Sequence, residues 1–174
     1  TCFNDMYFFP ESAGAAALTS GMRAVLAMTI LEFPTAYAAN ADEYFDKGLA
    51  AMEALRDTPR IGFTFGPHAP YTISDKTFER VGVLSSQLDL PVHIHVQETA
   101  QEVRDSLAQH GVRPIRRLES LGLVNSNLLA VHAVHLDDVD IETLAANGAS
   151  AAHCPASNLK LASGFSPIAA MRGA

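Results

Sequence analysis

The sequence predicts an α/β fold in which short apolar strands alternate with helices. Six stretches have the length and apolar character of strands, and helical patterns follow them. One stretch, residues 22–33, is nearly continuous apolar sequence, which suits a parallel strand covered on both faces. The 174 residues would hold six strand–helix units of about 29 residues, close to the roughly 31 per unit of an eight-fold barrel. No glycine-rich phosphate turn supports the main alternative, a doubly wound open sheet. The sequence therefore favours an incomplete (β/α)8 TIM-barrel-type fold, with about six units that correspond to the second to seventh of the barrel.

The elements follow one another in a regular order. Pro10 opens an alanine-rich helix that ends at the glycine stop Gly21, and Ser74 caps the third helix. The expected strands cover residues 2–8, 22–33, 61–68, 91–96, 127–133 and 149–155. The expected helices cover residues 10–21, 41–56, 74–88, 99–111, 114–121 and 137–148, and a polar loop over 157–164 precedes a last helix.

The fourth strand carries two histidines and is followed closely by a glutamate, residue types that are common in active sites. His93 and His95 face the side opposite to the apolar residues at 92, 94 and 96, because side chains alternate along a strand. Glu98 follows just beyond the strand. In barrels of this kind the carboxyl ends of the strands form the active face, so we expect His95 and Glu98 at that face.

Six of the seven histidines lie in or just beyond the ends of expected strands. The exception is His110 at the end of a helix. A single such histidine would most simply be a hydrogen-bonded core residue, but His68, His95, His132 and His153 end consecutive strands. This recurrence predicts a metal or acid–base site. Neutral imidazole is a good zinc ligand, and a carboxylate one step beyond the ligand can accept the proton of the water that the zinc activates.

Five segments of the sequence resemble the amidohydrolase superfamily, in the branch of 5-methylthioadenosine/S-adenosylhomocysteine deaminases and s-triazine hydrolases. The matching segments occur in the family's order and spread over nearly the whole chain. They are Asp5-Met6-Tyr7-Phe8, Gly66-Pro67-His68-Ala69-Pro70-Tyr71, His95-Val96-Gln97-Glu98-Thr99, His132-Ala133-Val134-His135-Leu136 and His153-Cys154-Pro155-Ala156-Ser157-Asn158-Leu159-Lys160-Leu161.

The resemblance implies a role for each of four residues. His95 matches the metal-binding histidine of the fifth barrel strand, and Glu98 matches the general acid/base. His68 matches a histidine that contacts the substrate, and His132 matches the sixth-strand histidine that activates or orients the water. For His93, His135 and His153 we expect packing or supporting roles.

The resemblance also implies parts that residues 1–174 lack. The family's His-x-His of the first barrel strand and the metal-binding aspartate of the eighth strand are not present. The sequence opens without methionine and stops within an expected helix. We therefore expect an internal piece of a longer protein, the central part of a single barrel domain without the first and eighth strands. We expect this piece alone to be inactive and to bind zinc weakly or not at all.

The implied reaction is metal-dependent hydrolytic deamination of an adenine-type nucleoside, such as 5-methylthioadenosine, S-adenosylhomocysteine or adenosine. The cofactor would be one zinc ion in the intact enzyme, and the substrate a small nucleoside or heterocyclic amine. Two alternatives stay open. One is an s-triazine chlorohydrolase or aminohydrolase, or a guanine or cytosine deaminase. The other is a metal-free barrel with a structural or binding role.

The composition indicates which classes of partner and which cellular compartment are to be expected. The net charge of −7 argues against nucleic acid, since a phosphate-binding surface needs a basic patch. No apolar run has the length of a membrane span, so we expect no membrane partner. Cys2 and Cys154 are far apart and form no metal motif, which suits a reducing, cytoplasmic compartment. A homo-oligomer is compatible with the sequence, although no interface is visible in it.

Overall fold

Six parallel strands form one curved sheet in which each strand pairs with its neighbours in the sequence. The computed structural model describes all residues from 1 to 174, and the strand order is β1-β2-β3-β4-β5-β6. The strands are β1 (Cys2–Asp5), β2 (Arg23–Ile30), β3 (Ile61–Pro67), β4 (Val92–Val96), β5 (Leu128–His132) and β6 (Ser150–Ala152). This sequential parallel order is that of a β/α barrel, and the predicted incomplete barrel is confirmed.

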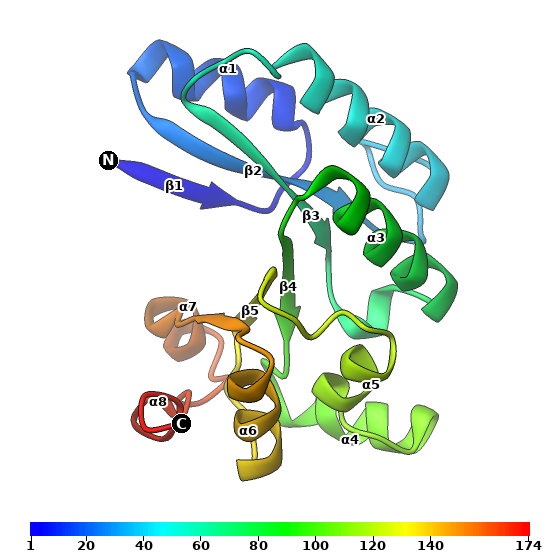
Figure 1. Cartoon of the computed structure of the whole chain (residues 1–174), viewed down its shortest axis with the longest axis vertical. Helices are drawn as coiled ribbons and strands as arrows, with labels where there is room; N and C mark the ends of the chain where they lie inside the picture. Colours follow the sequence, from blue (N-terminus) through cyan, green and yellow to red (C-terminus); the bar gives the residue numbers. More distant parts are fainter.

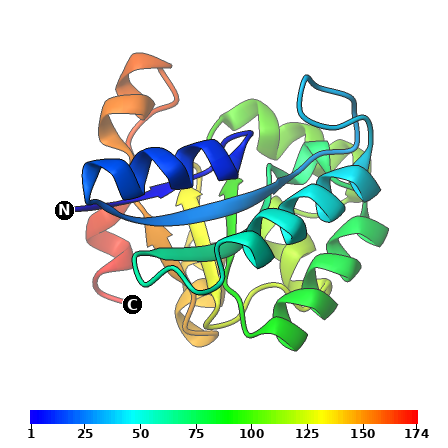
Figure 2. The same ribbon diagram turned by 90° about the horizontal axis from the view of Figure 1, so that it is seen from above.

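Helices connect the strands and cover the outer side of the arc (Figure 1). They are α1 (Pro10–Ser20), α2 (Ala41–Ala54), α3 (Asp75–Leu88), α4 (Ala100–His110), α5 (Pro114–Ser120) and α6 (Asp138–Ala146), followed by α7 (Pro155–Lys160) and α8 (Ile168–Met171). A short 3-10 turn, η1 (Pro70–Thr72), precedes α3. The turned view shows α1, α2 and α3 on one side of the strands, with α7 and α8 at the far end of the arc (Figure 2).

Several boundaries differ from the sequence prediction, and three of the differences have a clear local reason. Strand β1 ends at Asp5, because Phe8 turns away to stack on Tyr37 and Phe9 takes a left-handed φ of 59° that starts α1. Strand β6 ends at Ala152, because Pro155 lacks the N–H that a ladder needs and opens a helix instead. The expected polar loop over 157–164 is therefore wrong in its first part, which is α7.

The core lies between the sheet and the helices. Val92, Ile94 and Val96 of β4 are at most 4% exposed and belong to one cluster of buried apolar residues with Phe65 and Phe78. The expected alternation along β4 is therefore present, with the apolar residues toward the helices and the histidines toward the interior of the arc.

The cap at Ser74 and the glycine stop at Gly21 are those that the sequence predicts. The side chain of Ser74 accepts a hydrogen bond from the N–H of Thr77 at the start of α3, and Gly21 ends α1 at a positive φ of 71°. No helix is both long enough and apolar enough to cross a membrane.

Candidate active site

Three neighbouring strands bring three histidines together at their carboxyl ends. Phe65 is paired with Val92, so His68 lies opposite His95, and the N–H of His95 donates to the carbonyl of His68 at 3.1 Å. The ring centroids of His68 and His95 are 5.2 Å apart. On the other side, Val96 is paired with His132, and the ring centroids of His95 and His132 are 5.4 Å apart. The pairing of β3, β4 and β5 thus builds a row of imidazoles.

A backbone carbonyl fixes the orientation of the His95 ring. The Nδ1 atom of His95 lies 2.9 Å from the oxygen of His68, and a carbonyl can only accept, so Nδ1 carries the hydrogen. Burial lowers the pKa of His95, against the opposing effect of this hydrogen bond, and the nearby His132 lowers it further. His95 is therefore a neutral imidazole with a free lone pair at Nε2, the form that binds metals.

Burial and the neighbouring His95 also lower the pKa of His68. His68 is thus neutral near pH 7 and its Nδ1 is 3.3 Å from the hydroxyl of Thr72. Its ring meets the exposed Tyr71 edge-on at a centroid distance of 6.3 Å. A neutral imidazole beside an exposed aromatic ring can hydrogen-bond an uncharged heterocycle.

Glu98 lies next to His132. The Oε2 atom of Glu98 is 3.6 Å from Nε2 of His132, and its Oε1 accepts a hydrogen bond from the hydroxyl of Ser163 at 3.2 Å. The Nδ1 atom of His132 is 2.8 Å from Oδ1 of Asn158. A carboxylate beside an imidazole nitrogen is an arrangement that can take up and pass on a proton.

The backbone at the ends of β4 and β5 is strained. Gln97, His132 and Ala133 have positive φ values of 51°, 70° and 45°, a region that residues other than glycine rarely adopt. Strain of this kind persists where surrounding contacts enforce it and is common at functional sites. Here the carbonyl of Gln97 accepts from the N–H of Val134 at 3.1 Å and from that of His135 at 2.9 Å. The two strand ends hold each other in place.

The turn from β4 into α4 is held by Glu102. Its carboxyl oxygens accept from the N–H of Gln97 at 2.7 Å and from the N–H of Glu98 at 2.9 Å. Thr99 caps the helix three residues earlier by accepting from the N–H of Glu102. The Thr-x-x-Glu spacing, which is typical of a capping box, is the sequence signal that could have predicted a role for Glu102 at the start of α4.

Gln97 anchors the same turn from below and was also not predicted. Its side chain is fully buried and donates to Asp140 at 2.8 Å and to the carbonyl of His135 at 2.8 Å, while Oε1 accepts from the N–H of Ile115. Arg113 forms an ion pair with Asp140 at 2.8 Å. The contacts of Gln97 join residues that are far apart in the sequence. The position of Gln97 just after a strand therefore does not predict them.

The three remaining histidines of the strand ends differ from one another. His93 is 7% exposed, its Nδ1 has no hydrogen-bond partner, and burial, with a smaller effect of His95, lowers its pKa to about 4. His135 binds the carbonyl of Ser163 through Nε2 at 2.8 Å. His153 lies just beyond β6 and is exposed, so the structure does not bring it into the row of His68, His95 and His132.

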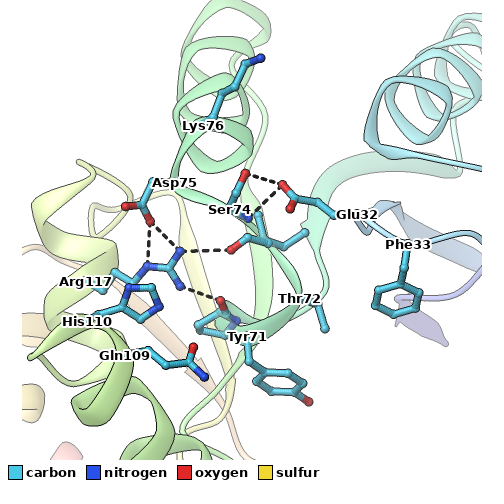
Figure 3. Close-up of a pocket in the computed structure, with 12 residues that line it drawn as sticks. Glu32, Phe33, Tyr71, Thr72, Ser74, Asp75, Lys76, Gln109, His110 and Arg117 are labelled. Atoms are coloured by element: carbon cyan, nitrogen blue, oxygen red, sulfur yellow. Dashed lines mark hydrogen bonds and ion pairs between the residues drawn. The ribbon is translucent and has the colours of Figure 1, made fainter.

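A pocket of about 670 Å³ is lined by residues that include Glu32, Tyr71 and Arg117, and His68, His95 and His132 do not line it. Figure 3 shows that Arg117 and Glu32 of this pocket are already paired within the chain. Arg117 is buried and binds Asp75 and the carbonyls of Pro70 and Ile73, and Glu32 accepts from Ser74 and Thr77. Although burial alone would raise the pKa of Glu32, the hydrogen bonds of Ser74 and Thr77 lower it overall. We therefore assign the chemistry to the histidines and Glu98.

The residues present fit part of a metal site. His95 presents the unprotonated Nε2 that a zinc ion needs, and its Nδ1 donates a hydrogen bond to the carbonyl of His68, which fixes the ring. No group of three His, Cys, Asp or Glu side chains in residues 1–174 is arranged to hold a metal ion. Because a catalytic zinc usually has three protein ligands, these residues account for one side of such a site.

The family model that matches this chain is that of the "Amidohydrolase family", and it covers residues 1–172. The chain belongs to the amidohydrolase family. A 5-methylthioadenosine/S-adenosylhomocysteine deaminase of Saccharophagus degradans is 48% identical over 168 residues, which are 97% of this chain and 38% of that relative. A 5'-deoxyadenosine deaminase of Methanoregula boonei is 40% identical over 93% of this chain and 37% of its own length. This amidohydrolase chain thus spans about two fifths of the length of the curated relatives that it matches.

Solved structures agree with the family and the fold. A crystal structure of an adenosine deaminase from Xanthomonas campestris with bound zinc has a TM-score of 0.96 and 50% sequence identity, over 99% of this chain and 39% of that one. An atrazine chlorohydrolase of Arthrobacter aurescens has a TM-score of 0.89 at 20% identity, over 99% of this chain and 42% of its own, which shows a shared fold.

Proposed function

We propose that residues 1–174 form the central part of a metal-dependent aminohydrolase that deaminates an adenine-type nucleoside. In this proposal they supply the second to seventh units of a single barrel domain, and the first and eighth strands lie outside them. Six consecutive parallel strands and the share of about two fifths of each relative support this placement. The deaminases among the relatives, at up to 48% identity, support the reaction class.

The observation that carries the proposal is the pair formed by Glu98 and His132 beside His95. Glu98 faces Nε2 of His132 at 3.6 Å, and His95 presents a free Nε2 in the adjacent position of the row. A site for aminohydrolysis needs a group that moves a proton from water to the ring, and a carboxylate in this place can do so.

Each residue then has a distinct task. Glu98 takes a proton from the attacking water and delivers it to the ring nitrogen next to the amino-bearing carbon. His132 orients that water through Nε2, and His68 contacts the substrate. After water adds to the carbon, the hydroxyl proton of the adduct passes by way of Glu98 to the amino group. The bond to that group then breaks, ammonia leaves, and the base is released in its keto form.

His95 would hold the metal, together with ligands from the rest of the barrel. A divalent metal, which we take to be zinc, supplies an activated water as the nucleophile when it is bound. The zinc in the adenosine deaminase that is 50% identical to this chain supports that choice. The chain alone, with one well-placed ligand, is expected to be inactive. Stoichiometric zinc together with ammonia release from the isolated 174-residue chain would contradict this expectation.

The substrate class also bears on the setting of the enzyme. Small nucleosides are metabolites of the cytoplasm, and the two cysteines, Cys2 and Cys154, are both free, as in proteins of reducing compartments. We propose a cytoplasmic enzyme without nucleic-acid or membrane partners.

A substrate panel on the full-length enzyme tests the proposal. Alternatively, residues 1–172 can replace the matching segment of the Xanthomonas enzyme, because the two superimpose with a TM-score of 0.96. Methylthioadenosine, adenosylhomocysteine, adenosine, guanine and a chlorotriazine are compared by ammonia or chloride release. We expect the highest kcat/KM with one of the three adenine nucleosides. A preference for guanine or for the chlorotriazine would replace the proposed reaction, and no turnover with zinc bound would favour a binding protein.

A further inference from the structure

The segment after β6 reaches the proposed acid–base pair with two buried polar side chains. Asn158 of α7 is 1% exposed and Ser163, in the turn after α7, is 6% exposed. Oδ1 of Asn158 lies 2.8 Å from Nδ1 of His132, and the hydroxyl of Ser163 donates to Oε1 of Glu98 at 3.2 Å. One segment thus contacts both His132, at the end of β5, and Glu98, in the turn after β4.

The direction of the contact at Asn158 determines which nitrogen of His132 carries the hydrogen in the neutral ring. A carbonyl oxygen can only accept, so with Oδ1 toward the ring Nδ1 of His132 carries a hydrogen and donates it. Nε2, which faces Glu98, then holds the lone pair in the neutral ring and the second hydrogen in the charged ring.

The other amide atom of Asn158 argues that the residue is not present for stability. Nδ2 of Asn158 is buried and has no hydrogen-bond partner in the chain. A buried donor without a partner costs folding free energy, and an apolar residue of similar size would avoid that cost. A role at His132 accounts for an amide in this place.

The segment is attached to the loop after β5 by further contacts. Nε2 of His135 donates to the carbonyl of Ser163 at 2.8 Å, and the hydroxyl of Ser166 donates to the carbonyl of Ala133 at 2.8 Å. Gly164 has a φ of 116°, and a Cβ there would come within 3.1 Å of the side chain of Val134. These contacts hold the segment closely against the loop that directly follows His132.

We propose that Asn158 is a positioning residue that keeps neutral His132 in the tautomer with hydrogen on Nδ1, and that Ser163 fixes Glu98 beside it. This inference rests on the proposed function for the meaning of the pair, but the tautomer itself is a property of the chain. It also gives His135 a task, which is to attach the positioning segment to the loop after β5.

Nitrogen-15 NMR of the histidine side chains in the 174-residue chain at pH 8 tests the proposal. In the wild type, Nδ1 of His132 should have the shift of a protonated ring nitrogen and Nε2 that of an unprotonated one. Asn158→Leu, of similar size, should move His132 toward the other tautomer or a mixture. Asn158→Asp, which can only accept, should keep the wild-type tautomer. The backbone amide spectrum away from the segment reports whether each variant is folded.

A wild-type His132 with hydrogen on Nε2, or an unchanged tautomer in a folded Asn158→Leu variant, would overturn the proposal. If Asn158→Leu does not fold, the wild-type and Asn158→Asp spectra still decide between the two tautomers. In the full-length enzyme, Asn158→Leu should lower kcat by about 10- to 100-fold, the usual effect of losing an outer hydrogen bond to such a histidine. If instead no deaminase activity is found while the tautomer is as proposed, the function fails and the positioning role of Asn158 stands.

Discussion

Glu102 should make the stability of the fold depend on pH. Burial raises the pKa of this carboxyl to about 7, against the opposing effect of hydrogen bonds from the N–H groups of Gln97 and Glu98, and the charge of Glu98 raises it further. The residue is 7% exposed, so solvent screens it little. Tyr71, Asp105 and Arg117 line the same small cavity, and the charge of Arg117 is already compensated by Asp75.

The sign and size of the effect follow from linkage. The pKa in the folded state lies above the ordinary value of 4.5, so the folded protein binds this proton more tightly than the unfolded chain. The contribution of Glu102 to the free energy of unfolding is therefore complete below about pH 4.5 and is lost as the pH rises through about 7. A difference between 4.5 and about 7 corresponds to about 3 kcal/mol.

Glu102→Gln tests this reasoning through urea unfolding at pH 5 and pH 8. The glutamine can accept only one of the two N–H groups, so it should cost about 1–3 kcal/mol at pH 5. At pH 8 Glu102 of the wild type is ionised and no longer contributes this stability. The free energies of unfolding of the two proteins should then be nearly equal, or that of the variant should be higher. Glu142→Gln, exposed on α6, is the matched control and should keep the wild-type pH dependence. If Glu102→Gln keeps it as well, the assignment to Glu102 is refuted.

Two further predictions concern the packing around the barrel. Arg117→Ala should lower the free energy of unfolding by about 2–5 kcal/mol, because it leaves the buried carbonyls of Pro70 and Ile73 without a donor. Arg56→Ala removes only an exposed ion pair with Glu53 and should cost about 1 kcal/mol or less. Phe78→Ala should cost about 3–5 kcal/mol because the ring is fully buried, and Phe165→Ala, 79% exposed, should change stability by about 0.5 kcal/mol or less. Urea unfolding at pH 7 measures both pairs, and equal effects within a pair would contradict the assigned burial.

The strand order and the covered faces could be predicted because they depend on local patterns. The alternation along β4 placed its apolar residues toward the helices and its histidines toward the interior, as the structure shows. The recurrence of His68, His95 and His132 at strand ends predicted that they would lie together, since parallel strands end at the same edge. Both inferences need only the two-residue period and the order of the strands.

The supporting contacts could not be predicted in the same way. Asn158 reaches His132 from a residue 26 positions away, and Gln97 reaches Asp140 over 43 positions. Such pairs depend on how loops fold over the strand ends, which no periodic pattern encodes. The strand prediction also failed where tertiary contacts took over, as at Phe8, whose ring packs in an aromatic cluster over the loop after β2. The site was therefore foreseen in its central residues and missed in the residues that hold them.

The central claim is that Glu98 carries the proton in a metal-dependent deamination. It is tested most directly by Glu98→Gln in the full-length enzyme or in the Xanthomonas chimera, with ammonia release and zinc content measured on the same samples. Glu79→Gln, exposed on α3, is the matched control. The account predicts that Glu98→Gln retains zinc and that its kcat falls by about 10²- to 10⁴-fold. The kcat and the zinc content of Glu79→Gln should equal those of the wild type. Near-normal turnover by Glu98→Gln would contradict it.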